Sequence, residues 1–138
     1  TPFVPGKAEI FWESAKPMAA IIGCGPLVYN CLLAAKELEK ENIRTMVVNC
    51  HTIKPIDEKL IIEVAKTCGT VVTVEEHQVM AGLGGAVAEV LAQHQPTPME
   101  FVGLKNTFGE SGSPKELIHK YGMDEQAIAE AVRRIIKR

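Results

Sequence analysis

The chain lacks a strong charge of either sign, long apolar runs and closely spaced cysteines. Its formal net charge is −2 over 138 residues, so no basic field argues for nucleic acid binding. No apolar run approaches the roughly 18 residues that a membrane span needs, so we expect no membrane association. The absence of a C-x-x-C pair disfavours a zinc site and indicates buried free thiols in a reducing cytoplasm. The cysteines are Cys24, Cys31, Cys50 and Cys68.

The N-terminus lacks the charged start and apolar core of a secretory signal peptide, which also favours a cytoplasmic location. Residue 1 is not Met, and Pro2, Pro5 and Gly6 give residues 1–6 the composition of a linker. We therefore expect residues 1–6 to leave an upstream domain and residues 7–138 to form a single domain. A chain near this length buries about 70% of its unfolded surface, which is enough for a real core.

Apolar and β-branched runs alternate with helix-patterned segments through the middle of the chain. The alternation predicts an α/β fold, in which a mostly parallel sheet is covered by helices on both faces. Only five residues, 13–17, separate the first two expected strands, so these strands should be antiparallel if they pair. The expected strands are residues 7–12, 18–22, 45–48, 70–74 and 100–104.

Capping residues predict where the first two helices begin and end. Gly25-Pro26 opens the first helix, because proline is tolerated in a first turn, and Asn42 ends it. Asp57 can cap the second helix with its side chain, and Gly69 is a typical C-terminal stop.

Three further helices are expected in the second half of the chain. Residues 84–93 have a helical apolar pattern. Residues 113–116 form a capping box with proline at the first helical position, and this helix should end near Gly122. Asp124 should then cap a separate last helix.

Motifs of several enzyme classes are absent. There is no G-x-S-x-G nucleophile elbow, and no Lys-Ser/Thr follows the glycines of residues 82–85 as in a P-loop. The histidines His51, His94 and His119 are dispersed, at no metal-ligand spacing from one another. The residues alone therefore indicate an α/β domain without a self-sufficient active site.

Gly23-Cys24-Gly25 follows an expected strand and opens a helix, so Gly23 and Gly25 are candidates for a weak anion site. The dinucleotide pattern G-x-G-x-x-G is incomplete, and residues 49–51 offer no acidic partner for a ribose. A tight turn that lets helix and sheet approach closely is the better explanation.

Glu75-Glu76-His77 stands at the carboxyl end of an expected strand. Two carboxylates beside an imidazole could act in acid–base catalysis. Adjacent side chains of an extended segment point to opposite faces, so at most one of Glu75 and Glu76 shares a pocket with His77 unless a turn intervenes. We favour a polar strand-end cluster that meets another domain.

Two glycine-containing loops precede expected helices. Gly82, Gly84 and Gly85 resemble an anion nest and extend the candidate interface cluster of Glu75, Glu76 and His77. The second loop contains further weak candidates for an anion site, where capping and a surface contact are the favoured roles. These candidates are Ser111, Gly112 and Ser113.

Three segments together make the chain resemble the C-terminal domain of transketolase. Each is moderately specific alone, whereas their order and spacing are strongly specific. They are residues 48–57, residues 73–77 followed by 82–87, and residues 108–117 leading to 121–123.

The resemblance implies a three-layer α/β/α fold around a five-stranded mixed sheet whose first strand is antiparallel. It implies a parent enzyme that transfers a two-carbon ketol unit between sugar phosphates. In that family, thiamine diphosphate and Mg²⁺ lie between a pyrimidine-binding and a diphosphate-binding domain at a homodimer interface, and the metal is held in a G-D-G…N motif. This chain contains no G-D-G. We therefore expect no catalytic, cofactor-binding or metal-binding residue in it, and a role in domain packing and dimer assembly.

Two alternatives remain open at this stage. The first two segments are shared with 1-deoxyxylulose-5-phosphate synthase and the beta subunits of 2-oxoacid dehydrogenases, although residues 108–117 look more like transketolase. An alternative of another class is a regulatory module that binds a small ligand or nucleotide at the turns of residues 23–25 or 82–85.

Overall fold

The computed structural model places most of the chain. The residues that it describes are 7–51, 53, 55–76, 82–104 and 114–138, and in the last of these ranges side chains are described from residue 124. The expected linker, residues 1–6, lies outside them.

Five strands form one mixed sheet in the order β1-β3-β2-β4-β5. β1 runs antiparallel to β3, and the other neighbouring strands are parallel, so the predicted fold class is confirmed. The first strand pairs with the third rather than with the second. The strands are β1 (Glu9–Glu13), β2 (Ala19–Gly23), β3 (Thr45–Asn49), β4 (Val71–Glu76) and β5 (Met99–Leu104).

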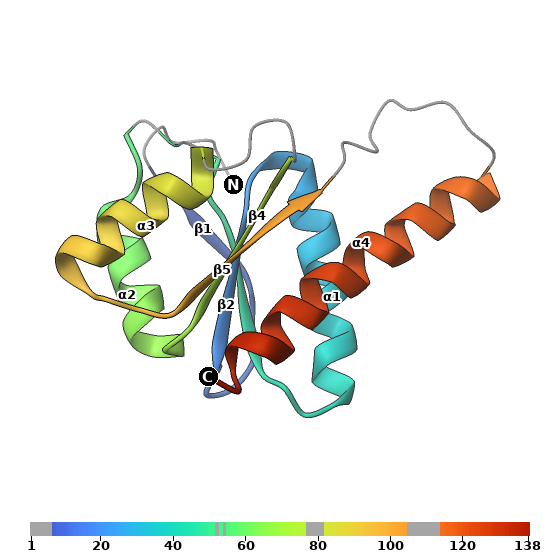
Figure 1. The fold of residues 1–138 in the computed structure, drawn as a ribbon, viewed down its shortest axis with the longest axis horizontal. Helices are drawn as coiled ribbons and strands as arrows, with labels where there is room; N and C mark the ends of the chain where they lie inside the picture. The colour runs from blue at the N-terminus through green and yellow to red at the C-terminus, as the bar shows by residue number, and fades with distance from the viewer. Residues whose placement is uncertain (1–6, 52, 54, 77–81, 105–113) are drawn as a thin grey trace.

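Helices cover both faces of the sheet (Figure 1). α1 (Val28–Lys40) and α4 (Pro114–Ile135) lie on one face, and α2 (Glu58–Cys68) and α3 (Gly82–His94) lie on the other. The sheet separates two hydrophobic cores. Because side chains of a strand alternate between faces, Ile21 packs into the core under α1 and α4, and Ile22 into the core under α2 and α3. Burial of such a side chain stabilises the fold by roughly 1.5–3 kcal/mol.

The predicted ends of α2 and the predicted C-terminal end of α1 are confirmed, whereas Gly25-Pro26 opens a short 3₁₀ helix, Gly25–Leu27, and α1 itself begins at Val28. Asp57 Oδ1 accepts a hydrogen bond from the Leu60 N–H at 3.2 Å, and Oδ2 accepts one from the Ala8 N–H at 3.0 Å. The cap of α2 therefore also holds the segment that enters β1. Gly69 has φ 80° after the last turn of α2, and Asn42 has φ 61° after α1. Both are left-handed positions of the kind that end helices.

The prediction of two helices after residue 113 was wrong, because Pro114–Ile135 is one continuous helix of 22 residues. Gly122 and Asp124 both lie inside it. Glycine costs about 1 kcal/mol relative to alanine in a helix but removes no backbone hydrogen bond, so it does not enforce a stop. The later turns gain more, since Ile128, Val132 and Ile135 are buried in the core.

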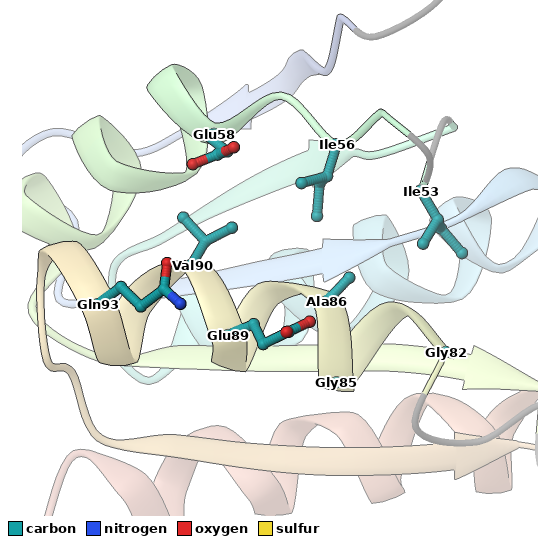
Figure 2. A pocket seen from close by; sticks show the side chains of 9 residues that line it. All are labelled: Ile53, Ile56, Glu58, Gly82, Gly85, Ala86, Glu89, Val90 and Gln93. Carbon is teal, nitrogen blue, oxygen red and sulfur yellow. The ribbon is translucent and has the colours of Figure 1, made fainter.

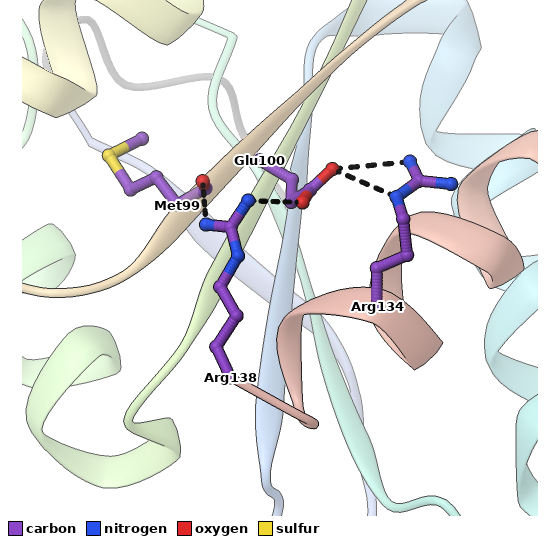
Figure 3. Close-up of polar contacts among 4 residues, drawn as sticks. All are labelled: Met99, Glu100, Arg134 and Arg138. Carbon is purple, nitrogen blue, oxygen red and sulfur yellow. Dashed lines mark hydrogen bonds and ion pairs between the residues drawn. The ribbon is translucent and has the colours of Figure 1, made fainter.

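A charged cluster fastens the end of α4 to the edge strand β5 (Figure 3). Glu100 Oε1 accepts a hydrogen bond from Arg134 Nη2 at 3.1 Å, and Glu100 Oε2 accepts one from Arg138 Nη2 at 2.7 Å. Arg138 Nη1 also donates to the Met99 carbonyl at 3.2 Å. The Glu100 side chain is only 13% exposed, so its charge depends on these partners more than a free surface carboxylate would.

The cysteines agree with the prediction of free thiols. Cys31, Cys50 and Cys68 are buried, Cys24 is partly exposed, and none of the four is in a disulfide. Within the described part of the chain, we find no helix with the length and apolar character that crossing a bilayer requires.

Candidate functional site

The topology points to the carboxyl ends of β2 and β4. These two strands are neighbours, but the chain leaves β2 towards α1 on one face and leaves β4 towards α3 on the other. In open parallel sheets, such a switch in direction opens a crevice where ligands bind. The turn after β2, which includes the short helix η1 (Gly25–Leu27), and the first turn of α3 border this place.

The first turn of α3 is capped by a carboxylate from β4. Glu75 Oε1 accepts the Leu83 N–H at 3.0 Å, and Glu75 Oε2 accepts the Gly84 N–H at 2.8 Å. Glu75 is only 4% exposed. The positive end of a helix dipole favours a negative charge at this place, and the two hydrogen bonds satisfy backbone donors that the helix leaves unpaired. The nest at the start of α3 therefore already holds an anion from the same chain.

Gly84 permits this close approach. A Cβ added at Gly84 would lie 3.1 Å from Glu75 Oε2, from Thr73 Oγ1 and from Phe101 Cδ1. Three side chains from two strands thus occupy the space that any other residue would need. Gly85 differs, because a Cβ there would meet nothing within 4 Å.

The turn after β2 is a close approach of helix and sheet, as the sequence predicts. A Cβ at Gly23 would lie 2.9 Å from Cys31 Sγ of α1. Gly25 has φ +62°, which favours glycine. The backbone geometry of this turn therefore explains both glycines without a ligand.

A cavity of about 320 Å³, here called the strand-end cavity, lies between these two turns. Among the described residues that line it, the charged groups are the carboxylates of Glu75 and Glu76. Partial burial raises the pKa of the Cys24 thiol at its wall, and the charges of Glu75 and Glu76 raise this pKa further. The cavity is lined by Cys24, Gly25, Pro26, Leu27, Ile53, Glu75, Glu76, Gly82 and Leu83.

The described residues that line the strand-end cavity do not fit thiamine diphosphate or a sugar phosphate. A diphosphate needs cationic side chains, a bound metal or free backbone N–H groups. Here the Leu83 and Gly84 N–H groups are taken by Glu75, and the Glu76 carboxylate would repel an incoming anion. Among the described residues, no group of three or more His, Cys, Asp or Glu side chains could hold a metal ion.

A wider groove of about 610 Å³, here called the α2–α3 groove, lies between the start of α2 and the outer side of α3 (Figure 2). Ile53, Ile56 and Ala86 point into it from opposite sides, whereas Glu58 and Glu89 stand at its border. The groove is lined by Ile53, Ile56, Glu58, Gly82, Gly85, Ala86, Glu89, Val90 and Gln93.

The structure brings together part of the predicted interface cluster. Glu75 and Gly84 are in direct contact, and Gly82 lines both the strand-end cavity and the α2–α3 groove. Glu76 lines only the cavity, and Gly85 only the groove.

The remaining candidates divide between the β2 turn and undescribed segments. Gly23 and Gly25 form the turn after β2, without a basic side chain among the described residues that line the cavity beside it. Four predicted site residues lie outside the described residues: His77, Ser111, Gly112 and Ser113.

Sequence reasoning missed two features of this region. The capping role of Glu75 has a signal in retrospect, namely an acidic residue at a strand end eight and nine positions before the two N–H donors. The apolar residues Ile53 and Ile56 lie between a strand and a helix with no periodicity of their own, so nothing in the sequence marks them as a groove wall.

Comparison with known proteins identifies the relatives of this chain. The profile of the family described as "Transketolase, C-terminal domain" matches residues 6–128. A 6-deoxy-6-sulfo-D-fructose transketolase subunit from Clostridium sp. (strain MSTE9) is 38% identical over 136 residues, which are 99% of this chain and 42% of that protein. A 1-deoxy-D-xylulose-5-phosphate synthase from Caldanaerobacter subterraneus subsp. tengcongensis is 35% identical over 131 residues, which are 94% of this chain and 21% of that protein.

A solved structure gives the same result. It is described as a split gene transketolase, an inactive beta4 tetramer, and it matches with a TM-score of 0.82 and 40% identity. The match covers 99% of this chain and 44% of the other, so this chain spans less than half the length of each of these three relatives. Family profile, sequence relatives and fold agree: the chain belongs to the transketolase C-terminal domain family.

Proposed function

We propose that this chain is the C-terminal domain of a thiamine-diphosphate-dependent transketolase and supplies contact surface rather than catalytic groups. The parent enzyme would transfer a two-carbon ketol unit between sugar phosphates in the cytoplasm. The observation that carries the proposal is that the Glu75 carboxylate accepts the Leu83 and Gly84 N–H groups of the first turn of α3, which a phosphate would otherwise contact. The feature that could bind phosphate in such a fold is used here for internal structure.

The cofactor and its metal would bind elsewhere in the parent enzyme. Thiamine diphosphate and Mg²⁺ would be held between the pyrimidine-binding and diphosphate-binding domains, and this domain would pack against them and help to assemble a homodimer. The length of the relatives supports this arrangement, since the chain corresponds to 42% of the Clostridium transketolase subunit and 44% of the split gene transketolase.

The test compares the complete protein, here taken to include any separately encoded subunit of the enzyme, with this chain alone. With thiamine diphosphate, Mg²⁺ and a ketose and aldose phosphate pair, we expect ketol transfer by the complete protein and none by residues 1–138. Turnover by the isolated chain would refute the contact-surface role. Absence of transfer by the complete protein, loaded with cofactor, would refute the transketolase assignment.

One alternative within the superfamily has a specific observation in its favour, the 35% identity to a 1-deoxy-D-xylulose-5-phosphate synthase. Formation of 1-deoxyxylulose 5-phosphate by the complete protein would establish that alternative. Capture of an acyltransferase core by the complete protein would instead indicate a 2-oxoacid dehydrogenase beta subunit.

The regulatory-module alternative is tested by thermal shift of the complete protein with nucleotides and sugar phosphates in the absence of thiamine diphosphate. A ligand that binds only the folded form raises stability by RT ln(1 + [L]/Kd). We expect variants in the strand-end cavity, such as Glu76→Gln, to leave every such shift unchanged. A shift that Glu76→Gln alters would favour the regulatory module.

A further inference from the structure

The strand-end cavity and the α2–α3 groove lie next to each other, and together they are here called the depression. Ile53 and Gly82 line both of them, so the two adjoin at the start of α3. The depression therefore runs from η1, past the end of β4, along the outer side of α3.

The lining of this depression combines apolar side chains with carboxylates. Ile53 and Ile56 line one side of the groove and Val90 lines the facing side, and Glu58 and Glu89 are exposed at its border. Except for the Cys24 thiol, every ionisable side chain among its described lining residues is a carboxylate. Glu58 has a neighbour, His94, whose Nε2 lies 3.5 Å from its Oε1.

This charge pattern decides what kind of occupant fits. Among the described lining residues at the border, phosphates and nucleotides would meet the like charges of Glu58 and Glu89. A free apolar molecule would leave the carboxylates without partners when it covers them, which is costly. A protein segment could contact the apolar lining with an apolar side chain and pair with the carboxylates through lysine or arginine on either side of it. Complementary charges at an interface favour association and fix its register.

We propose that the α2–α3 groove, with the adjoining strand-end cavity, is the surface on which a basic, apolar-centred segment of the companion thiamine-binding domains docks. The inference rests on the proposed function, because it names the surface through which the domain packs in the parent enzyme. In the assembled enzyme, Glu58 and Glu89 pair with lysine or arginine of that segment, and an apolar side chain enters between Ile56 and Ala86.

The first experiment labels carboxylates in the complete protein with carbodiimide and glycine ethyl ester. Glu63 is the matched control, because it is exposed on the same helix as Glu58 and does not line the groove. We expect Glu89 and Glu58 to react at least about fivefold more slowly than Glu63, since a docked segment buries them. Omission of the amine should give zero-length cross-links from Glu58 or Glu89 to a lysine of a companion domain.

The second experiment uses variants of the complete protein. Glu89→Lys should increase the labelling rate of Glu58 several-fold, because it repels the docked segment, whereas Glu63→Lys, with the same change of charge, should leave that rate unchanged. Ala86→Phe fills the groove and should act like Glu89→Lys. Circular dichroism checks that each variant is folded. The first experiment uses the unmodified protein, so its result does not depend on the folding of any variant.

Three results would overturn the inference: labelling of Glu89 as fast as Glu63, cross-links only to a second copy of this chain, or cross-links to an unrelated protein. These results are distinguishable from failure of the proposed function. A protein that catalyses ketol transfer while Glu58 and Glu89 stay fully reactive keeps its function and loses this docking surface. A protein without ketol transfer loses the assignment whatever the labelling shows.

Discussion

The Glu75 carboxylate accepts the backbone N–H of Gly84 at 2.8 Å, so a side chain from the end of β4 caps α3. A second hydrogen bond, from the Leu83 N–H at 3.0 Å, uses the other carboxylate oxygen. A strand and a helix are thus joined by a bidentate contact that is buried and charge-assisted. The contact fixes the position of α3, and with it one wall of the α2–α3 groove.

We expect Glu75→Gln to destabilise the fold by about 1–3 kcal/mol, because a buried donor loses its acceptor. The glutamine amide has one oxygen and one NH₂ group, so one of the Leu83 and Gly84 N–H donors would face another donor. Urea denaturation of the variant and of the parent protein measures the difference. Glu76→Gln is the control, since Glu76 is half-exposed at the cavity wall, and it should change stability by less than about 0.5 kcal/mol. Equal effects of the two substitutions would contradict the capping role.

The adjacent glycines of α3 should respond in opposite ways to alanine. Gly84→Ala forces a Cβ to within 3.1 Å of Glu75 Oε2, Thr73 Oγ1 and Phe101 Cδ1, and we expect a loss of about 1–3 kcal/mol. Gly85→Ala meets nothing within 4 Å and should stabilise the helix by about 0.5–1 kcal/mol, because alanine loses less backbone entropy. Thermal unfolding of both variants gives the comparison. A Gly84→Ala protein as stable as Gly85→Ala would show that the side chains of β4 and β5 next to Gly84 move aside at little cost.

Much of the fold could be predicted from local chemistry. The run at Ile21-Ile22 is apolar at every position because the strand is buried on both faces, and Asp57 and Gly69 bracket α2 with a side-chain cap and a left-handed stop. Such signals act within one turn or one strand, so the sequence alone carries them.

The features that the sequence analysis missed depend on packing between residues that are far apart along the chain. Gly122 does not end α4, because burial of Ile128 and Ile135 and the ion pairs of Glu100 stabilise the later turns of a helix that glycine only weakens. Glu75 looked like a catalytic or interface residue, since a cap from eight or nine residues away follows from how β4 and α3 are placed in three dimensions.

Removal of the Glu100 carboxylate should loosen the end of α4. Arg134 and Arg138 both donate to Glu100, so Glu100→Ala should cost about 1 kcal/mol and increase hydrogen exchange in the last turns of the helix. Glu37→Ala breaks the exposed pair of Glu37 with Lys40 and should cost less than about 0.5 kcal/mol. High salt should reduce the effect of Glu100→Ala only partly, because its side chain is largely covered. Unchanged exchange in α4 after Glu100→Ala would rule out this anchoring.

Thiol reactivity should report the electrostatics of the strand-end cavity. Partial burial, together with the charges of Glu75 and Glu76, raises the pKa of Cys24, so its alkylation by iodoacetamide near pH 8 should be slower than that of a free cysteine. Glu76→Gln removes one of these charges and should speed the reaction. Stability has a matching sign: the unfolded chain loses the thiol proton first, above about pH 8.5, so the free energy of unfolding falls as pH rises beyond that value. Faster alkylation in the parent protein than in Glu76→Gln would contradict the assigned cause.

The turn after β2 offers a test in which two substitutions compensate. Gly23→Ala alone places a Cβ 2.9 Å from Cys31 Sγ and 3.6 Å from Val28 Cγ2, so we expect a loss of about 1–3 kcal/mol. Cys31→Ala alone removes a buried sulfur and should cost about 1 kcal/mol. In the double variant the new methyl group enters the space that the sulfur vacates. The double variant should therefore lose about 1 kcal/mol less unfolding free energy than the two single variants lose together. Urea denaturation of the four proteins completes the cycle. Strict additivity would mean that the helix moves away from the sheet instead, and that contact between Gly23 and Cys31 does not set the spacing of α1.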